Sequence, residues 1–174
     1  MKKTFLSPDV IHLNRHQRRA LGITLAVGYT RVSTQGQVDD GLSLVTQEEK
    51  SIQRAEGLGF QYLITYTDGG ISGGDIEHRA GILQLLEDAG KGLFDAVIIY
   101  SISRMSRELT DFLSIVSILE SYDIKLISIS EAIEASSSGN FSRNIIAVAA
   151  QFERERTSEL VAENMNTIAK RGVL

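Results

Sequence analysis

The sequence lacks cysteine entirely, and from Phe141 to Arg171 it contains neither glycine nor proline. The absence of cysteine excludes a disulfide framework and a thiolate metal site. No apolar run approaches the ~20 residues that a membrane-spanning helix needs, and the N-terminus lacks the apolar core of a secretory signal. These absences predict a cytoplasmic globular protein with no membrane contact, and a length of 174 residues suits one domain.

Positive charge is concentrated at the N-terminus. Residues 1–21 contain five basic side chains and one acidic side chain, whereas the whole chain has a net charge of −4. We interpret residues 1–22 as a basic N-terminal arm, which is either a solvated leader or a contact for nucleic acid or a partner. The acidic remainder argues against broad, nonspecific nucleic-acid binding by this chain alone.

Strand and helix patterns alternate along the chain. Four apolar, β-branched segments are predicted to form strands, over residues 23–30, 62–67, 95–101 and 124–130. Helical patterns lie over residues 46–59, 79–92 and 107–122. This alternation predicts an α/β fold with a mostly parallel four- or five-stranded sheet and helices on both faces.

The C-terminal part has a different pattern. Because residues 141–171 contain no helix breaker, they are predicted to form one long helix, which at ~1.5 Å per residue would span roughly 45 Å. A compact domain does not need a helix of that length. The helix is either a terminal core helix or one that leaves the body to meet another subunit or a ligand, with Phe152 and Met165 as candidate contacts.

Chemically active side chains follow two of the predicted strands. Tyr29, Arg31 and Ser33 alternate along the end of the first strand, so they are expected to project from one face. Arg104 and Arg107 come just after the third strand, at a spacing that places them on one face of a helical turn. The carboxyl ends of strands in open α/β sheets are where ligands bind.

A further arginine, Arg79, opens a predicted helix behind a glycine-rich loop. Each arginine taken alone is compatible with a solvated charge or a salt bridge. Guanidinium groups also match phosphate oxygens with two parallel hydrogen bonds and remain charged. Together with Ser33, the arginines suggest a serine nucleophile that attacks phosphorus, with arginine in place of Mg²⁺ stabilising the transition state.

Several ordered motifs extend this hypothesis over residues 24–171. They are YTRVSTQGQ, SLVTQ, YTDGGISGG with Arg79 behind it, SRMSR and AAQFERER. In this order they resemble the catalytic domain of the serine site-specific recombinases, the resolvase/invertase family. The gap between Gln37 and Ser43 and the predicted long helix are more similar to the large serine integrases and transposon recombinases than to the small resolvases.

The resemblance implies that Ser33 attacks the scissile phosphate of double-stranded DNA, which forms a 5′-phosphoserine link and frees a 3′-hydroxyl. It implies neither metal nor other cofactor, because the covalent link stores the bond energy. The implied active-site arginines are Arg31, Arg79, Arg104 and Arg107. The implied supporting residues are Tyr29, Gln37, Gln47, Asp68, Glu153 and Arg154.

The resemblance also implies an assembly. Family members act as a homodimer that pairs into a tetramer in the synaptic complex, exchanges DNA ends by rotation and religates them. Residues 23–140 are then the catalytic domain, and residues 141–174 are an oligomerisation helix that leads to missing DNA-binding domains. We therefore expect a truncated piece of a bacterial or phage-encoded, DNA-associated recombinase.

One position departs from the family pattern. The acidic residue that usually precedes the first arginine of the third-strand motif is replaced by Ser103, before Arg104. A serine hydroxyl is a poor acid or base at neutral pH. Either the chemistry tolerates the change, or another group such as Asp68 substitutes, or the protein is slow or inactive. The alternative function is a catalytically impaired dimerisation or synapsis module of the same fold.

Overall fold

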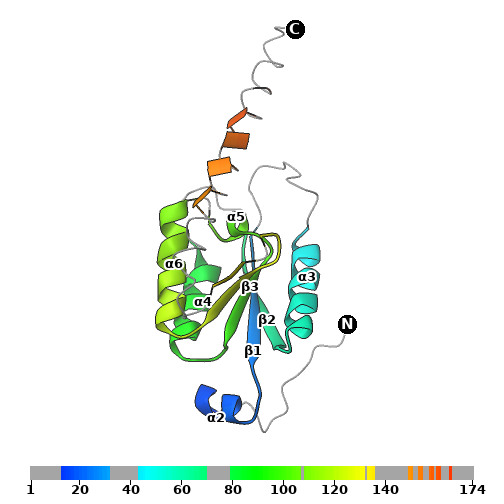
Figure 1. Ribbon diagram of the computed structural model, residues 1–174, viewed down its shortest axis with the longest axis vertical. Coiled ribbons are helices and arrows are strands. Elements are labelled where there is room, and N and C mark those ends of the chain that lie inside the picture. The colour runs from blue at the N-terminus through cyan, green and yellow to red at the C-terminus, as the bar shows by residue number, and fades with distance from the viewer. Residues whose placement is uncertain are drawn as a thin grey trace.

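The computed structural model describes residues 13–31, 43–69, 79–106 and 108–131, the backbone of 133–135, and helical positions 149, 150, 153, 154, 157, 158, 160, 161 and 165. A five-stranded sheet in the order β2-β1-β3-β4-β5 lies at its centre (Figure 1). The parallel strands are β1 (Leu25–Arg31), β2 (Gln61–Asp68), β3 (Ala96–Ile99) and β4 (Lys125–Ser128). The edge strand β5 (Ile133–Ala135) is antiparallel to β4.

Helices cover both faces of this sheet. The helix α3 (Leu44–Gly57) lies on one face, and α4 (Ala80–Gly90) and α6 (Leu109–Ser121) lie on the other (Figure 1). The short helix α5 (Ile102–Met105) follows β3 at the carboxyl end of the sheet, and α2 (Arg15–Ala20) lies at the opposite, amino end. The predicted α/β class and mostly parallel sheet are confirmed, whereas α2, α5 and β5 were not predicted.

Alternation along the strands divides the core in two. Leu25, Val27 and Tyr29 of β1 belong to the larger apolar cluster, which includes residues of α4 and α6, while Ala26 belongs to a smaller cluster with Ala55 of α3. The strands β1 and β3 are buried along almost their whole length, because helices cover both faces of the sheet. Strands buried on both faces have continuous apolar sequences, as these two do. The same alternation places Arg31 on the face of Tyr29, as predicted.

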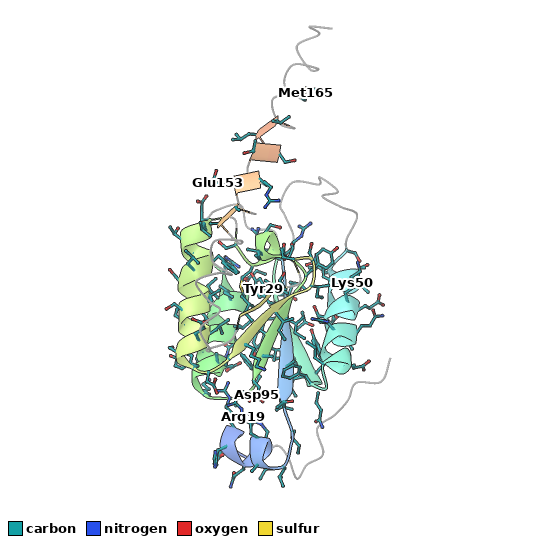
Figure 2. The ribbon with its side chains drawn as sticks, viewed as in Figure 1. Arg19, Tyr29, Lys50, Asp95, Glu153 and Met165 are labelled. Carbon is teal, nitrogen blue, oxygen red and sulfur yellow. The ribbon has the colours of Figure 1, made fainter. Side chains whose placement is uncertain are left out.

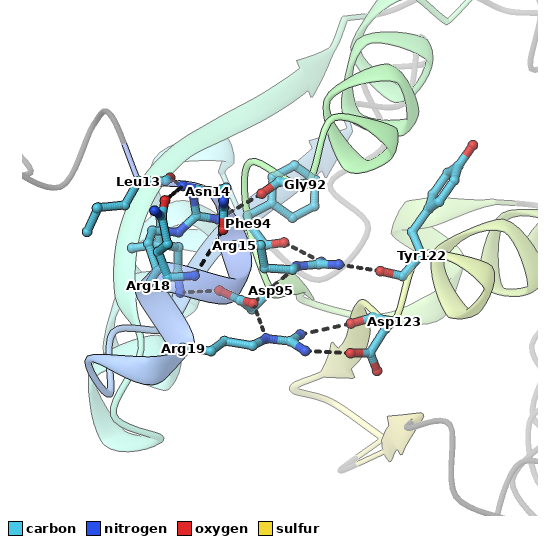
Figure 3. Close-up of polar contacts among 12 residues, drawn as sticks. Leu13, Asn14, Arg15, Arg18, Arg19, Gly92, Phe94, Asp95, Tyr122 and Asp123 are labelled. Carbon is cyan, nitrogen blue, oxygen red and sulfur yellow. Dashed lines mark hydrogen bonds and ion pairs between the residues drawn. The ribbon is translucent and has the colours of Figure 1, made fainter.

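The described part of the N-terminal arm differs from both expectations, because its arginines dock on the body of the protein (Figure 3). The carboxylate of Asp95 is 3 % exposed and lies 3.2 Å from Arg15 Nε and 2.8 Å from Arg19 Nε. Arg19 Nη1 also lies 2.5 Å from the carboxylate of Asp123. The buried Arg18 donates to the carbonyl of Gly92 at 2.7 Å. Basic residues near the chain end thus neutralise carboxylates at the amino end of the sheet.

The C-terminal positions that the structure describes are helical and extend beyond the carboxyl end of the sheet (Figure 1). Within them, Arg154 Nε donates to the carbonyl of Ala150 at 3.2 Å, and Thr157 Oγ1 donates to that of Glu153 at 2.7 Å. An uninterrupted helix over residues 141–171 remains a prediction, because most of that range lies outside the described residues. Within the described part of the chain, no helix is long and apolar enough to cross a membrane.

Candidate active site

The candidate site lies where the parallel strands end. Arg31 is the last residue of β1, Asp68 is the last residue of β2, and Ser128 is the last residue of β4. The chain leaves β3 directly into α5, which carries Ser103 and Arg104. Residues from four segments that are distant in the sequence therefore meet at one edge, because all four strands run in the same direction.

A buried cluster of Tyr29, Asp68 and Arg79 underlies this edge. The Tyr29 hydroxyl donates to Asp68 Oδ2 at 2.7 Å and accepts from Arg79 Nη2 at 2.6 Å. Arg79 Nε lies 3.5 Å from Asp68 Oδ2, and both residues are 8 % exposed. Burial raises the pKa of the Tyr29 hydroxyl above its ordinary value, against the opposing effect of Arg79, so the phenol stays protonated at neutral pH.

Asp68 also fixes the start of α4. Its Oδ1 accepts the amide of Gly81 at 2.6 Å, and its Oδ2 accepts that of Ile82 at 3.1 Å. This carboxylate from β2 therefore caps a helix whose own N-cap residue, Arg79, makes no side-chain cap bond. A Cβ atom at position 81 would lie 2.8 Å from Asp68 Oδ1 and from the Thr67 carbonyl, so the close approach requires glycine.

Two arginines hold α5 through its backbone. Arg31 Nη2 donates to the Ser103 carbonyl at 3.0 Å, and Arg79 Nη2 donates to the Met105 carbonyl. Arg104, between these two carbonyls, is partly exposed. The contact from Arg31 joins the end of β1 to the arginine-bearing turn after β3, so the structure brings Arg31 and Arg104 to the same edge, as the sequence pattern predicted.

The remaining predicted residues have different positions. Ser103 Oγ lies 3.0 Å from Ser101 Oγ, and Gln47 is 1 % exposed in the first half of α3. Glu153 and Arg154 are exposed, and Figure 2 shows Glu153 on the C-terminal segment, well apart from Tyr29. The structure therefore does not bring the E-R pair to the cluster. The predicted nucleophile Ser33, the supporting Gln37 and the arginine Arg107 lie outside the described residues.

Two features of this edge were missed by the sequence patterns. Glu131, in the turn after β4, accepts the amide of Ile102 at 3.3 Å and the hydroxyl of Ser128. Lys50 Nζ of α3 lies 4.9 Å from the ring centroid of Tyr100, the residue that follows β3 (Figure 2 labels Lys50). An acidic residue just past a strand end was the available signal for Glu131, whereas nothing local marks Lys50.

The donors at this edge are those of an anion site. The described ranges contain no group of three His, Cys, Asp or Glu side chains that could hold a metal ion. Arg31, Arg79 and Arg104 instead supply fixed positive charge and planar sets of N–H donors, which suit phosphate oxygens. The arrangement can therefore bind a phosphodiester and stabilise negative charge that develops on it.

Comparison with known proteins defines the class. The family model described as "Resolvase, N terminal domain" matches residues 26–174. This match covers most of the chain, including the strand ends that carry the arginine cluster, and it begins after α2. The chain belongs to the resolvase family of serine recombinases and matches the N-terminal domain of that family.

Particular relatives support the same assignment. A "Putative DNA recombinase" of Bacillus subtilis (strain 168) is 32 % identical over 146 residues, which are 84 % of this chain and 28 % of the relative. The chain thus spans under a third of the length of that curated relative. The N-terminal catalytic domain of TP901-1 integrase is similar, with 34 % identity, a TM-score of 0.63, and coverage of 78 % of this chain and 99 % of that one. A resolvase family site-specific recombinase from Streptococcus pneumoniae has 29 % identity, a TM-score of 0.59, and coverage of 84 % and 99 %.

Proposed function

We propose that this chain is the catalytic part of a site-specific DNA recombinase that cleaves and rejoins double-stranded DNA through Ser33. The Ser33 oxygen attacks the scissile phosphorus and loses its proton, while the bond from phosphorus to the 3′-oxygen breaks and that oxygen gains a proton. The product is a 5′-phosphoserine ester and a free 3′-hydroxyl. Attack of a 3′-hydroxyl on this ester reverses the step, so no external energy source is required.

The contact between Arg31 and the Ser103 carbonyl carries the proposal. It sets the end of β1, two residues before Ser33, against the turn that holds Arg104. A phosphate beside Ser33 would then lie close to both guanidinium groups, which can stabilise the extra negative charge of the transition state. Arg79, which is buried against Tyr29 and Asp68, adds positive charge and positions α5. We extend the phosphate-binding role to Arg107.

The position of Ser103 favours a second candidate function, an impaired dimerisation or synapsis module. Asp68 is a poor substitute for the carboxylate that Ser103 replaces, because its oxygens already accept bonds from Tyr29, Gly81 and Ile82. Loss of proton-transfer assistance typically costs about 10²–10⁴ in rate. We favour a slow but active enzyme, since the arginines that stabilise charge are retained.

Assembly is part of the proposal. Leu160, Val161 and Met165 are exposed on the C-terminal helical positions, where apolar side chains have no cover from the sheet. Such side chains support a surface that meets a second copy, first in a homodimer and then in a synaptic tetramer on DNA. Phe152, the other candidate contact on the proposed oligomerisation helix, lies outside the described residues.

Covalent trapping tests the nucleophile directly. Protein expressed from its natural gene is incubated with sheared genomic DNA of the encoding organism and quenched with SDS. Adducts are recovered by phenol partition, and after nuclease digestion mass spectrometry locates the nucleotide mass. We expect the mass on Ser33, no adduct from Ser33→Ala, and unchanged adduct from the control Ser114→Ala, a serine exposed on α6. Adduct formation by Ser33→Ala contradicts the assignment.

Adduct formation then separates the two candidate functions. Ser103→Asp restores a carboxylate beside Arg104, and we expect faster single-turnover cleavage with unchanged DNA affinity. If the protein binds DNA and associates with itself, but neither the wild type nor the Ser103→Asp variant forms an adduct, the chain is the impaired module.

A further inference from the structure

The helix α5 starts without a cap from its own sequence. Ser101 has the extended conformation of an N-cap residue (φ −146°, ψ 161°), but its side chain makes no cap hydrogen bond. Its hydroxyl is instead paired with Ser103 Oγ at 3.0 Å. The first amides of a helix have no partner within the helix and need an acceptor from elsewhere.

Glu131 supplies that acceptor from the turn after β4. One carboxylate oxygen accepts the amide of Ile102, the first residue of α5, at 3.3 Å. The other accepts the hydroxyl of Ser128, which is 3 % exposed at the end of β4. The carboxylate therefore ties the start of α5 to the neighbouring strand, across the edge where the candidate site lies.

The anchored helix presents the groups that contact the arginines. The carbonyl of Ser103 receives Arg31, the carbonyl of Met105 receives Arg79, and Arg104 projects from the same turn. A helix of four residues has little stability of its own, because helix nucleation is unfavourable. The place of α5, and with it the geometry of the arginines, therefore depends on contacts from outside the helix.

We infer that Glu131 is a positioning residue for DNA cleavage, which holds α5 so that Arg31 and Arg104 converge on one phosphate. The inference rests on the proposed function for its catalytic consequence, but its structural part does not. Glu131 does not touch the reacting atoms in this assignment, so its effect is on the cleavage step and not on DNA affinity.

Two variants and a control separate the anchoring bond from the carboxylate charge. Glu131→Ala removes both, whereas Glu131→Gln keeps an oxygen that can accept the Ile102 amide and removes the charge. The matched control is Glu120→Ala. Glu120 is a partly buried carboxylate near the end of α6, at the amino end of the sheet, and so lies away from the candidate site. Cleavage is measured as single-turnover adduct formation on the trapped genomic fragment, and affinity by filter binding of the same fragment.

We expect Glu131→Ala to slow cleavage by about 10²-fold, since misplacement by ~1 Å is enough for that loss. DNA affinity should not change, Glu131→Gln should recover most of the rate, and Glu120→Ala should cleave normally. Cleavage at the wild-type rate by Glu131→Ala overturns the inference. So does an equal loss of rate in the Ala and Gln variants, which would assign the effect to the charge.

Hydrogen exchange gives a readout that needs no DNA. Glu131→Ala should increase amide exchange over residues 102–105, with α3 and β1 unaffected, and Glu131→Gln should restore protection. Unchanged exchange in Glu131→Ala refutes the anchor even if the recombinase is active. If the wild-type protein gives no adduct while exchange changes as expected, the proposed function fails and the anchor stands.

Discussion

The two ends of the sheet each hold a buried aspartate among arginines, but the two sites are built differently. At the amino end, Asp95 is paired with Arg15 and Arg19, and it also accepts the amide of Leu25 at 3.0 Å. At the carboxyl end, Asp68 pairs with the guanidinium of Arg79 and also accepts from a hydroxyl and from helix amides.

This difference separates arginines that fasten a segment from arginines that surround a site. At the amino end, Arg15 and Arg19 pair with Asp95, and Arg19 also pairs with Asp123, so these arginines dock α2 on the body (Figure 3). At the carboxyl end, one carboxylate organises Tyr29, Arg79 and α4, while Arg31 and Arg104 add positive charge at the same edge. Arginine charge gathered at the ends of parallel strands attracts a phosphate, and we expect Arg15 and Arg19, which are held against Asp95 and Asp123, to attract one less.

The largest expected effect is that of removing the carboxyl-end aspartate. Asp68→Ala leaves Arg79 buried without its carboxylate and removes the cap of α4, so we expect a loss of about 3–5 kcal/mol in the free energy of unfolding. Urea unfolding followed by circular dichroism measures it. Asp68→Asn, which keeps an acceptor oxygen, should lose less. A loss below about 1 kcal/mol in the alanine variant would mean that the cluster contributes little to the fold.

Next in size is the loss of cleavage when arginines at this end become lysine. Arg31→Lys and Arg104→Lys keep the charge but lose the planar fork, and we expect cleavage to fall by about 10²–10³-fold with little change in Tm. Adduct formation on the trapped fragment measures the rate. Arg19→Lys at the amino end is the matched control and should cleave normally. Equal rates in all three variants would erase the distinction between the two ends.

A smaller effect is expected from breaking the amino-end cluster. Asp95→Ala removes the ion pairs to Arg15 and Arg19 and the hydrogen bond from the Leu25 amide. Arg19 is partly exposed and can rehydrate, so we expect about 2 kcal/mol of lost stability. Limited proteolysis should cut near α2 sooner, while cleavage of DNA below the melting temperature stays normal. If cleavage falls along with stability, the amino-end cluster is not purely structural.

The smallest effect concerns the Tyr29 hydroxyl and alkaline pH. Burial raises the pKa of Tyr29 above its ordinary value, so the folded state retains a proton that the unfolded chain releases above about pH 10. The contribution of Tyr29 to stability should therefore be constant below that pH and fall above it.

Tyr29→Phe should cost about 1 kcal/mol at neutral pH and make the alkaline fall shallower. The fall should not vanish, since burial also raises the pKa of Tyr62, to about 12. Unfolding free energies between pH 8 and about pH 11 measure the difference. A variant and wild type with the same pH dependence would show that Tyr29 does not titrate in this range.

Much of the fold was readable from local pattern. The apolar, β-branched runs placed β1 to β4 within three residues of their observed ends, and strand alternation correctly placed Arg31 on the face of Tyr29. The order of strands and helices predicted a parallel sheet, so the meeting of Arg31 with the turn of Arg104 followed from topology. Periodicity and chain direction are properties of neighbouring residues, which is why one sequence suffices to find them.

Only the tertiary structure decided what each charged residue does. Arg19 meets Asp95 and Asp123, far along the chain, and this pairing turned an expected leader or binding arm into a docked helix. Helices α2 and α5 have six and four residues, too few for periodicity to signal, and each is held by distant partners. The hydrogen bond from the Ile102 amide to the Glu131 carboxylate joins the segment after β3 to the turn after β4. Electrostatic and hydrogen-bond partners are chosen by proximity in space, which the sequence determines only through the folded chain.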